Sequence, residues 1–227
     1  MSQHLVKTLK EVEQTTGRRI SLVNGESRHS GRFIQGYHEL NGSTDTIWLY
    51  PHLPPDASEA TAAHELAHVI QASSGYPRAL ASAAPEEANY ERLAAAINNL
   101  VLDVNADRWA LKHGFNIGRA LSCSGLHTVM TAMREAPVEA CSEKSSSTTT
   151  LAMVLDYAAL KLRLNRFGLF DELDRLWELR WPLSRSAGQA LSRALTRFAF
   201  SSAASCRRAM EKIVEFLKVP PGYIKIS

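Results

Sequence analysis

Two histidines and a glutamate lie close enough in this chain of 227 residues to bind and use a metal ion. His64 and His68 are four residues apart, and Glu65 directly follows the first, in the pattern H-E-x-x-H. On a helix, residues four apart share one face, so both imidazoles could bind the same ion. Neutral imidazoles suit zinc, and a glutamate beside the first ligand can take a proton from a zinc-bound water. The pattern therefore indicates hydrolysis, with one Zn²⁺ as cofactor and Glu65 as general base.

The neighbouring residues favour this interpretation over an amphipathic helix that carries two histidines on its polar face. Apart from the two histidines and the glutamate, residues 62–70 are all alanine, leucine, valine or isoleucine. Imidazoles without partners are costly in such apolar surroundings, whereas metal-bound imidazoles are satisfied. We therefore expect a helix here whose histidines are metal ligands.

A catalytic zinc needs a third protein ligand and one open position. No histidine follows at the close spacing of the H-E-x-x-H-x-x-G-x-x-H peptidases, where Gly75 and serines stand instead. A carboxylate is therefore expected, and Asp103 is the best candidate because it lies four residues before Asp107 in a second predicted helix, residues 85–113. Asp103 would bind the ion, and Asp107 would accept a hydrogen bond from the far nitrogen of a liganding histidine.

The distance between the two helices leaves other carboxylates open as the third ligand. In a simple helical hairpin, His68 lies about six residues before the turn and Asp103 about 18 residues into the second helix. At ~1.5 Å per residue the two would then be roughly 18 Å apart along the helices. Either residues 78–92 make an excursion, or the ligand lies nearer the turn. Glu91 fits that second case better, with Glu87 as a further alternative.

The elements before this segment must position it. Apolar residues at helical spacing predict a helix over residues 3–16, ended by Gly17. Asp56 or Ser58 offers an N-cap for the H-E-x-x-H helix. Three stretches bounded by turn residues predict strands of a small antiparallel sheet, at residues 19–23, 32–37 and 46–50.

The strand at residues 46–50 is our candidate for holding a substrate. In many zinc peptidases a strand beside the zinc-binding helix pairs its edge, backbone to backbone, with an extended peptide. A buried core strand without any role in substrate binding is an equal alternative.

These patterns together resemble a known family. The H-E-x-x-H segment, followed by D-x-x-A-D at residues 103–107, is similar to the gluzincin peptidases, in which an acidic residue in E-x-x-[AS]-[DN] completes the site. The order of a leading helix, short strands and the His-Glu-Leu-Ala-His helix looks most like the ImmA/IrrE-type metallopeptidases, across residues 19–113. The resemblance implies a zincin-like core and zinc-dependent endopeptidase action on a protein substrate. It also implies that both histidines and Asp103 are ligands and that Glu65 is the base.

The second half of the chain predicts a linker and a helical region. The polar stretch 136–150 ends in Glu-Lys-Ser-Ser-Ser-Thr-Thr-Thr, which is typical of a linker or mobile loop. Apolar spacing after it favours three helices, at residues 150–166, 169–180 and 185–218. The expected fold is thus α+β and mostly α-helical, with a metallopeptidase core at residues 1–135, a linker at 136–150 and a basic helical region at 151–227.

Charge is distributed unevenly along the chain. Residues 151–227 hold 13 Lys and Arg against 7 Asp and Glu, whereas residues 1–150 hold 13 against 16. A nucleic-acid surface is one interpretation, but the region has no C-x-x-C pair and no glycine-rich phosphate loop. A solvated charged face is therefore favoured, and nucleic acid remains the alternative partner. The arginines concerned are Arg193, Arg197, Arg207 and Arg208.

Composition narrows the class and the compartment. The chain is 45% hydrophobic and 22% charged, as in ordinary globular proteins. Its first residues predict no secretion signal, and no window predicts a membrane span. Three widely spaced cysteines, Cys123, Cys141 and Cys206, predict neither a disulfide framework nor a thiolate zinc site. A reducing, cytoplasmic location is the simplest interpretation, and specialised export to a host or target cell is the alternative.

A zinc peptidase also needs a group that stabilises the oxyanion formed from the scissile carbonyl. The sequence offers four candidates that it does not rank: Tyr90, His113, His127 and Tyr157. The expected function is therefore a zinc endopeptidase acting on a protein or peptide. One rival is a regulatory or binding protein that keeps a peptidase-like zinc site, and another is a peptidase that attacks a foreign target.

Overall fold

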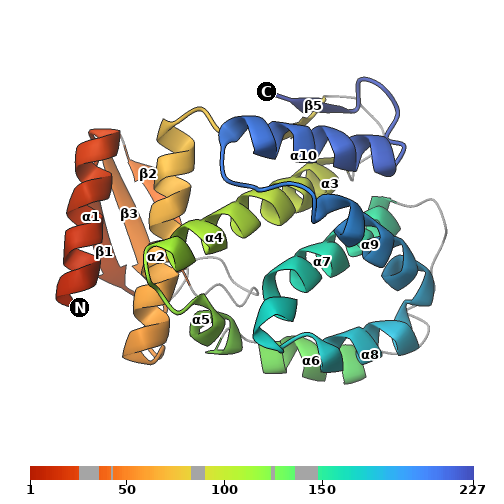
Figure 1. The fold of residues 1–227 in the computed structure, drawn as a ribbon, viewed down its shortest axis with the longest axis horizontal. Helices are drawn as coiled ribbons and strands as arrows, with labels where there is room; N and C mark the ends of the chain where they lie inside the picture. The colour runs from red at the N-terminus through yellow and green to blue at the C-terminus, as the bar shows by residue number, and fades with distance from the viewer. Residues whose placement is uncertain (26–35, 42, 83–89, 124–125, 136–147) are drawn as a thin grey trace. The chain divides into compact units, whose positions relative to one another are not determined.

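The protein, described here from a computed structural model, is mostly helical with two small sheets, which confirms the predicted α+β class (Figure 1). The chain divides into two compact units. The first unit holds residues 1–75 and 105–127, and the second holds 76–104 and 128–227. No helix within the described residues is long and apolar enough to cross a bilayer. The structure describes residues 1–25, 36–41, 43–82, 90–123, 126–135 and 148–227.

The first unit contains a three-stranded sheet in the order β1–β3–β2. Its strands are β1 (Arg19–Asn24), β2 (Gly36–Asn41) and β3 (Thr44–Leu49). β2 and β3 are antiparallel because only two residues separate them, whereas β1 pairs with β3 in parallel. The sheet is therefore mixed, and the prediction of an antiparallel sheet is wrong.

The strand predicted at residues 46–50 lies mostly in β3, which is paired on both sides. Its side chains alternate between buried and half-buried, so this is the core strand of the sheet. The prediction that it offers its edge to a substrate is therefore wrong. Among the strands that the structure describes, β2 is the edge strand next to the H-E-x-x-H helix. Of the strand predicted at 32–37, residues 32–35 lie outside the described residues.

Two helices cover this sheet. The predicted helix over residues 3–16 is confirmed as α1 (Gln3–Thr16), which ends at Gly17 with a φ of 69°. The H-E-x-x-H motif lies in α2 (Pro55–Ser73), which packs against α1, β2, β3 and α5 (Ile117–Cys123). No side chain caps the start of α2, so the predicted caps Asp56 and Ser58 are wrong. Pro55 starts the helix instead, since its ring fixes φ and it has no N–H to satisfy.

The second predicted helix is confirmed from residue 90 onward, and residues 85–89 lie outside the described residues. It runs as α3 (Tyr90–Asn98), the π-helical turn η1 (Asn99–Asp103) and α4 (Val104–Lys112). The chain does not form a simple hairpin before it. β4 (Ala79–Ala81) pairs with the C-terminal strand β5 (Ile224–Ile226). The distance argument required such a departure from a simple hairpin if Asp103 was to be a ligand.

The rest of the second unit is helical, and the helices predicted at 150–166 and 169–180 are confirmed. The third predicted helix, residues 185–218, is two helices, because Ser202 forms a capping box with Ser205 and starts a new one. Residues 136–147 of the predicted linker are outside the described residues, and residues 148–150 are already helical. The helices are α6 (Leu126–Glu135), α7 (Thr148–Leu164), α8 (Asp171–Arg180), α9 (Pro182–Leu195) and α10 (Ala203–Phe216), with a short 3-10 turn, η3 (Asn165–Phe167).

The two compact units do not follow the predicted division of the chain. A core of residues 1–135 and a helical region of 151–227 would be divided once, at the linker. Instead, residues 76–104 group with the C-terminal helices, and residues 105–127 group with the N-terminal sheet. The predicted domains themselves stay a prediction.

Gly36 allows β2 to approach α2 closely. A Cβ atom at this position would lie 2.8 Å from Thr61 Cγ2, 3.1 Å from the Trp48 carbonyl oxygen and 3.3 Å from Glu65 Cγ. We predict that Gly36→Ala lowers the free energy of unfolding by about 1–3 kcal/mol, as other overpacking substitutions do. Urea denaturation measures this change.

The double variant Gly36→Ala with Thr61→Ser is the matched control. Serine keeps the hydroxyl that donates to Ala57 O and removes the obstructing methyl group, so it should restore part of the lost stability. Alanine in an unobstructed strand would stabilise slightly relative to glycine. A Gly36→Ala variant as stable as the wild type would therefore contradict the close approach.

Candidate metal centre

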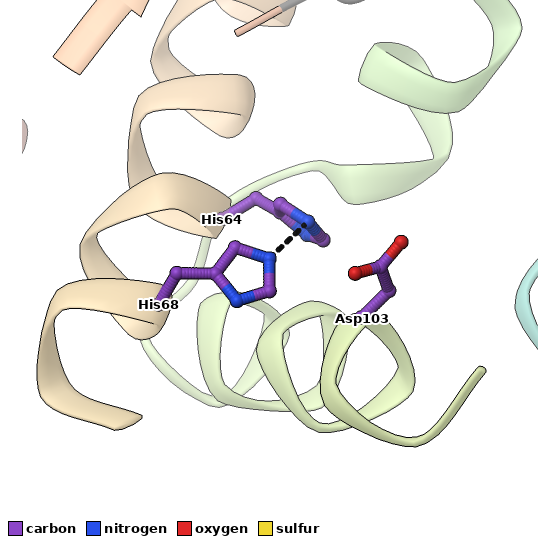
Figure 2. A group of neighbouring side chains, drawn as sticks. All are labelled: His64, His68 and Asp103. Carbon is purple, nitrogen blue, oxygen red and sulfur yellow. Dashed lines mark hydrogen bonds between the residues drawn. The ribbon is translucent and has the colours of Figure 1, made fainter. Parts of the chain in front are cut away.

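The two histidines of the motif face each other across one turn of α2. Their Nε2 atoms are 3.1 Å apart, and the ring planes are nearly perpendicular (Figure 2). The other nitrogen of each ring, Nδ1, makes a hydrogen bond on the side of the ring away from this contact. His64 Nδ1 donates to Asp107 Oδ1 at 2.8 Å, and His68 Nδ1 donates to Gln71 Oε1 at 2.7 Å. The directions follow from chemistry, since carboxylate and amide oxygens only accept.

These hydrogen bonds select the tautomer of both rings. With the proton on Nδ1, each neutral imidazole carries its lone pair on Nε2. Two lone pairs that face each other at 3.1 Å repel unless a proton or a metal cation lies between them. Zinc bonds of about 2.0–2.1 Å in a tetrahedron place neighbouring ligand atoms about 3.3 Å apart. The separation of the two nitrogens therefore fits a shared zinc ion.

The carboxylate of Asp103 lies close to the two histidine rings. One ligand atom from each of His64, His68 and Asp103 lies within 4.8 Å of the others, and Figure 2 draws the carboxylate directed toward the two rings. Asp103 ends η1, one turn before Asp107 on the same helical stretch. Glu91 is exposed and is not part of this group, and Glu87 lies outside the described residues.

The π-helical turn has a geometric consequence for this centre. A π-turn contains one more residue than an α-turn and so rotates the following helix by roughly 100° relative to an unbroken one. Before it, α3 buries Leu93 and Ile97 in the hydrophobic core of the second unit. After it, Asp107 faces His64 in the first unit. The π-helical turn thus lies between the apolar residues of α3 and the acidic residue Asp107 of α4 along one continuous helical stretch.

Glu65 is buried beneath β2, with 7% of its surface exposed. His38 on β2 places Nδ1 3.7 Å from Glu65 Oε2, and its ring stacks on His68 with the centroids 5.9 Å apart. Burial alone would raise the pKa of Glu65. The hydrogen bond from His38, together with the positive charge that His68, His64 and His38 carry when protonated, outweighs burial, so the pKa of Glu65 lies below its ordinary value. The carboxylate is therefore ionised at neutral pH and can accept a proton.

Sequence reasoning missed three polar residues of this centre. His38 belongs to a strand with no pattern linking it to the motif. Gln71 follows His68 by three residues, a spacing that could have indicated a contact on one helix face. Its Nε2 donates to Asn105 Oδ1 at 2.7 Å, which orients the amide so that Oε1 faces His68. Both amides are buried, so this chain of hydrogen bonds is protected from water.

The predicted oxyanion-stabilising residues have other contacts. The Tyr157 ring is fully buried in the second unit, and its hydroxyl donates to Asp174. Burial, together with this hydrogen bond, raises the pKa of Tyr157 to about 12. The His113 ring stacks on the Trp109 ring, and His113 Nδ1 donates to the Trp109 carbonyl oxygen. The Tyr90 ring packs beside Tyr223. The side chain of His127 lies outside the described residues.

The four arginines considered as a nucleic-acid surface differ in their roles. Arg207 Nη1 donates to Ile226 O at 3.0 Å and so holds the C-terminal strand against α10. Arg193, Arg197 and Arg208 are exposed, which is compatible with a solvated charged face.

Two imidazole nitrogens and one carboxylate oxygen make a donor set that suits zinc. The centre also has what such sites usually require, since each histidine is oriented through its second nitrogen. Comparisons of the chain with protein-family models, curated proteins and solved structures found no match. Only the chemistry and geometry of the centre therefore bear on the function of the chain.

Asp107 provides a test of the metal centre. We predict that Asp107→Asn weakens zinc binding by about 10–100-fold, because a neutral amide orients His64 less firmly and makes it a weaker donor. Competition with a zinc-chelating dye at fixed pH measures the affinity. Asp56→Asn, which removes an exposed acid on α2, should leave the affinity unchanged. Equal affinities for the Asp107→Asn variant and the wild type would contradict a role for this hydrogen bond.

Proposed function

We propose that this chain is a zinc-dependent endopeptidase with a zincin-like core, acting in the cytoplasm on a protein or peptide substrate. His64, His68 and Asp103 would hold one zinc ion, and Glu65 would be the general base. The observation that carries the proposal is the convergence of two oriented imidazoles and a carboxylate, next to a buried glutamate whose pKa is lowered.

The residues of the centre divide the reaction between them. When bound, zinc lowers the pKa of a coordinated water and polarises the scissile carbonyl. Glu65 would take a proton from the attacking water as the new C–O bond forms, and would deliver it to the amine nitrogen as the C–N bond breaks. Asp107 and Gln71 hold the two imidazoles in the tautomer that directs Nε2 toward the centre. Peptide and water are thereby converted into a carboxylic acid and an amine.

The position of β2 is an argument that the substrate is an extended peptide. It is the edge strand among the described strands, and it lies next to the helix that carries the motif. Backbone pairing along such an edge binds extended chains with little dependence on sequence. His38 extends from this strand toward Glu65, so a peptide paired there would lie close to the base.

Glu65→Gln separates catalysis from metal binding. Glutamine keeps the shape of the side chain but cannot take a proton, so turnover should fall by at least about 100-fold. The zinc content should stay near one ion per chain, because Glu65 is not a ligand. Cleavage of a library of quenched fluorescent peptides measures turnover. Cleavage at the wild-type rate would contradict the mechanism, and a zinc-loaded wild type that cleaves no peptide would favour the rival binding function.

Elemental analysis of the purified protein tests the ligand set. The wild type should contain about one zinc per chain, and both His64→Ala and Asp103→Ala should lose most of it, since each removes one of three ligands. His52→Ala removes an exposed histidine that lies outside the centre, so it should retain the metal. Full zinc content in Asp103→Ala would show that another group is the third ligand.

A further inference from the structure

We propose that Arg163 is a positioning residue for the third metal ligand, so that the C-terminal helical region forms part of the metal centre. The inference rests on the proposed function, because it assigns Asp103 as a ligand. Arg163 Nη1 donates to Asp103 Oδ2 at 2.9 Å, from the last turn of α7. α7 lies outside residues 1–135, the predicted metallopeptidase core.

The ion pair between Arg163 and Asp103 is largely shielded from solvent. The side chains of Arg163 and Asp103 are 20% and 24% exposed, so both are mostly covered. α7 packs directly on η1, the π-helical turn that ends at Asp103. On either side of Arg163, the helix is anchored by buried Ala158 and Leu164. The guanidinium is therefore supplied by a fixed element rather than by a loose surface side chain.

Anchoring one carboxylate oxygen changes what Asp103 offers to a metal. Asp103 has two oxygens and can rotate about its terminal bond unless something holds its plane. With Oδ2 bonded to Arg163, this rotation is fixed and the carboxylate presents one oriented oxygen toward the histidines. This repeats for the third ligand what Asp107 and Gln71 do for the two imidazoles. Each of the three ligands is then oriented by a hydrogen bond to a residue that does not itself bind the metal, as is usual in metal sites.

The positive charge of Arg163 opposes zinc binding, whereas its hydrogen bond to Asp103 favours it. Whether zinc affinity falls or rises when Arg163 is removed therefore shows which of the two effects is larger. A guanidinium near the centre repels a divalent cation and partly neutralises the ligand. If this repulsion dominated, removing Arg163 would strengthen zinc binding. If positioning dominates, as we propose, removing it weakens zinc binding by about 10–100-fold, the usual cost of losing such a partner.

The experiment compares zinc affinities of the full chain by competition with a chelating dye. Arg163→Met keeps the bulk of the side chain without its charge or donors, and it should weaken zinc binding about 10–100-fold. Arg163→Lys should give an intermediate affinity, since an ammonium can donate but lacks the planar fork of guanidinium. Arg166→Met, an exposed arginine three residues on, should match the wild type.

A double variant separates positioning from charge. In an Asp103→Ala background, Arg163→Met should cause no further loss of affinity, because Arg163 acts through Asp103. A direct effect of charge on the ion would persist there. The spectrum of the Co²⁺-substituted protein gives a second readout, which should shift in Arg163→Met as the carboxylate ligand is lost or reoriented. If Arg163→Met does not fold, Arg163→Lys takes its place in these comparisons.

The outcomes are distinguishable. Arg163→Met with wild-type or tighter affinity and an unchanged Co²⁺ spectrum would overturn the role of Arg163, while the proposed function would stand. If Arg163→Met does not fold, wild-type affinity and an unchanged spectrum in Arg163→Lys would overturn it equally. A wild type that binds no zinc would overturn the proposed function itself.

Discussion

The centre depends on two imidazole nitrogens held 3.1 Å apart with their lone pairs facing each other. Two rings that are both protonated on Nδ1 repel each other in this arrangement unless a proton or a metal cation lies between the two Nε2 atoms. Hydrogen bonds on the opposite side of each ring, to Asp107 and to Gln71, orient the two Nε2 atoms toward each other. The arrangement is therefore complementary to a cation, as in other metal centres whose histidines are oriented through their second nitrogen.

This constraint explains features of the fold that are otherwise unconnected. The long helical stretch that contains Asp103 and Asp107 includes a π-helical turn that ends at Asp103, and Asp107, four residues later, bonds His64. β2 must come close to α2 to place His38 beside Glu65, and glycine at position 36 permits this approach. A bulkier residue at position 36 would clash with Thr61 and Glu65 and would force β2 away from α2.

Sequence reasoning succeeded where a repeated pattern or a spacing carries the information. The helix over residues 3–16, the H-E-x-x-H helix and the grouping of Asp103 with the motif all follow from positions that recur at helical spacing. Strand pairing depends on contacts between segments far apart in the chain, so the parallel pair β1–β3 and the central place of β3 were not predictable in this way. The distance argument against Asp103 failed for the same reason, because β4 pairs with a strand at the C-terminus.

The residues that were missed have a common physical character. His38, Gln71, Asn105 and Arg163 are single polar residues whose partners lie on other elements or depend on side-chain orientation. No periodicity marks them, since each is needed once. In a chain met as sequence alone, metal ligands are therefore easier to identify than the groups that orient them.

The two histidines are not equivalent, and the difference has a chemical consequence. His64 donates to a carboxylate, whereas His68 donates to a neutral amide that Asn105 holds in turn. A carboxylate partner makes an imidazole a stronger donor to a metal than an amide partner does. His64 is thus expected to bind a metal more strongly than His68. The ring of His68, the weaker ligand, stacks on the ring of His38, which also contacts Glu65.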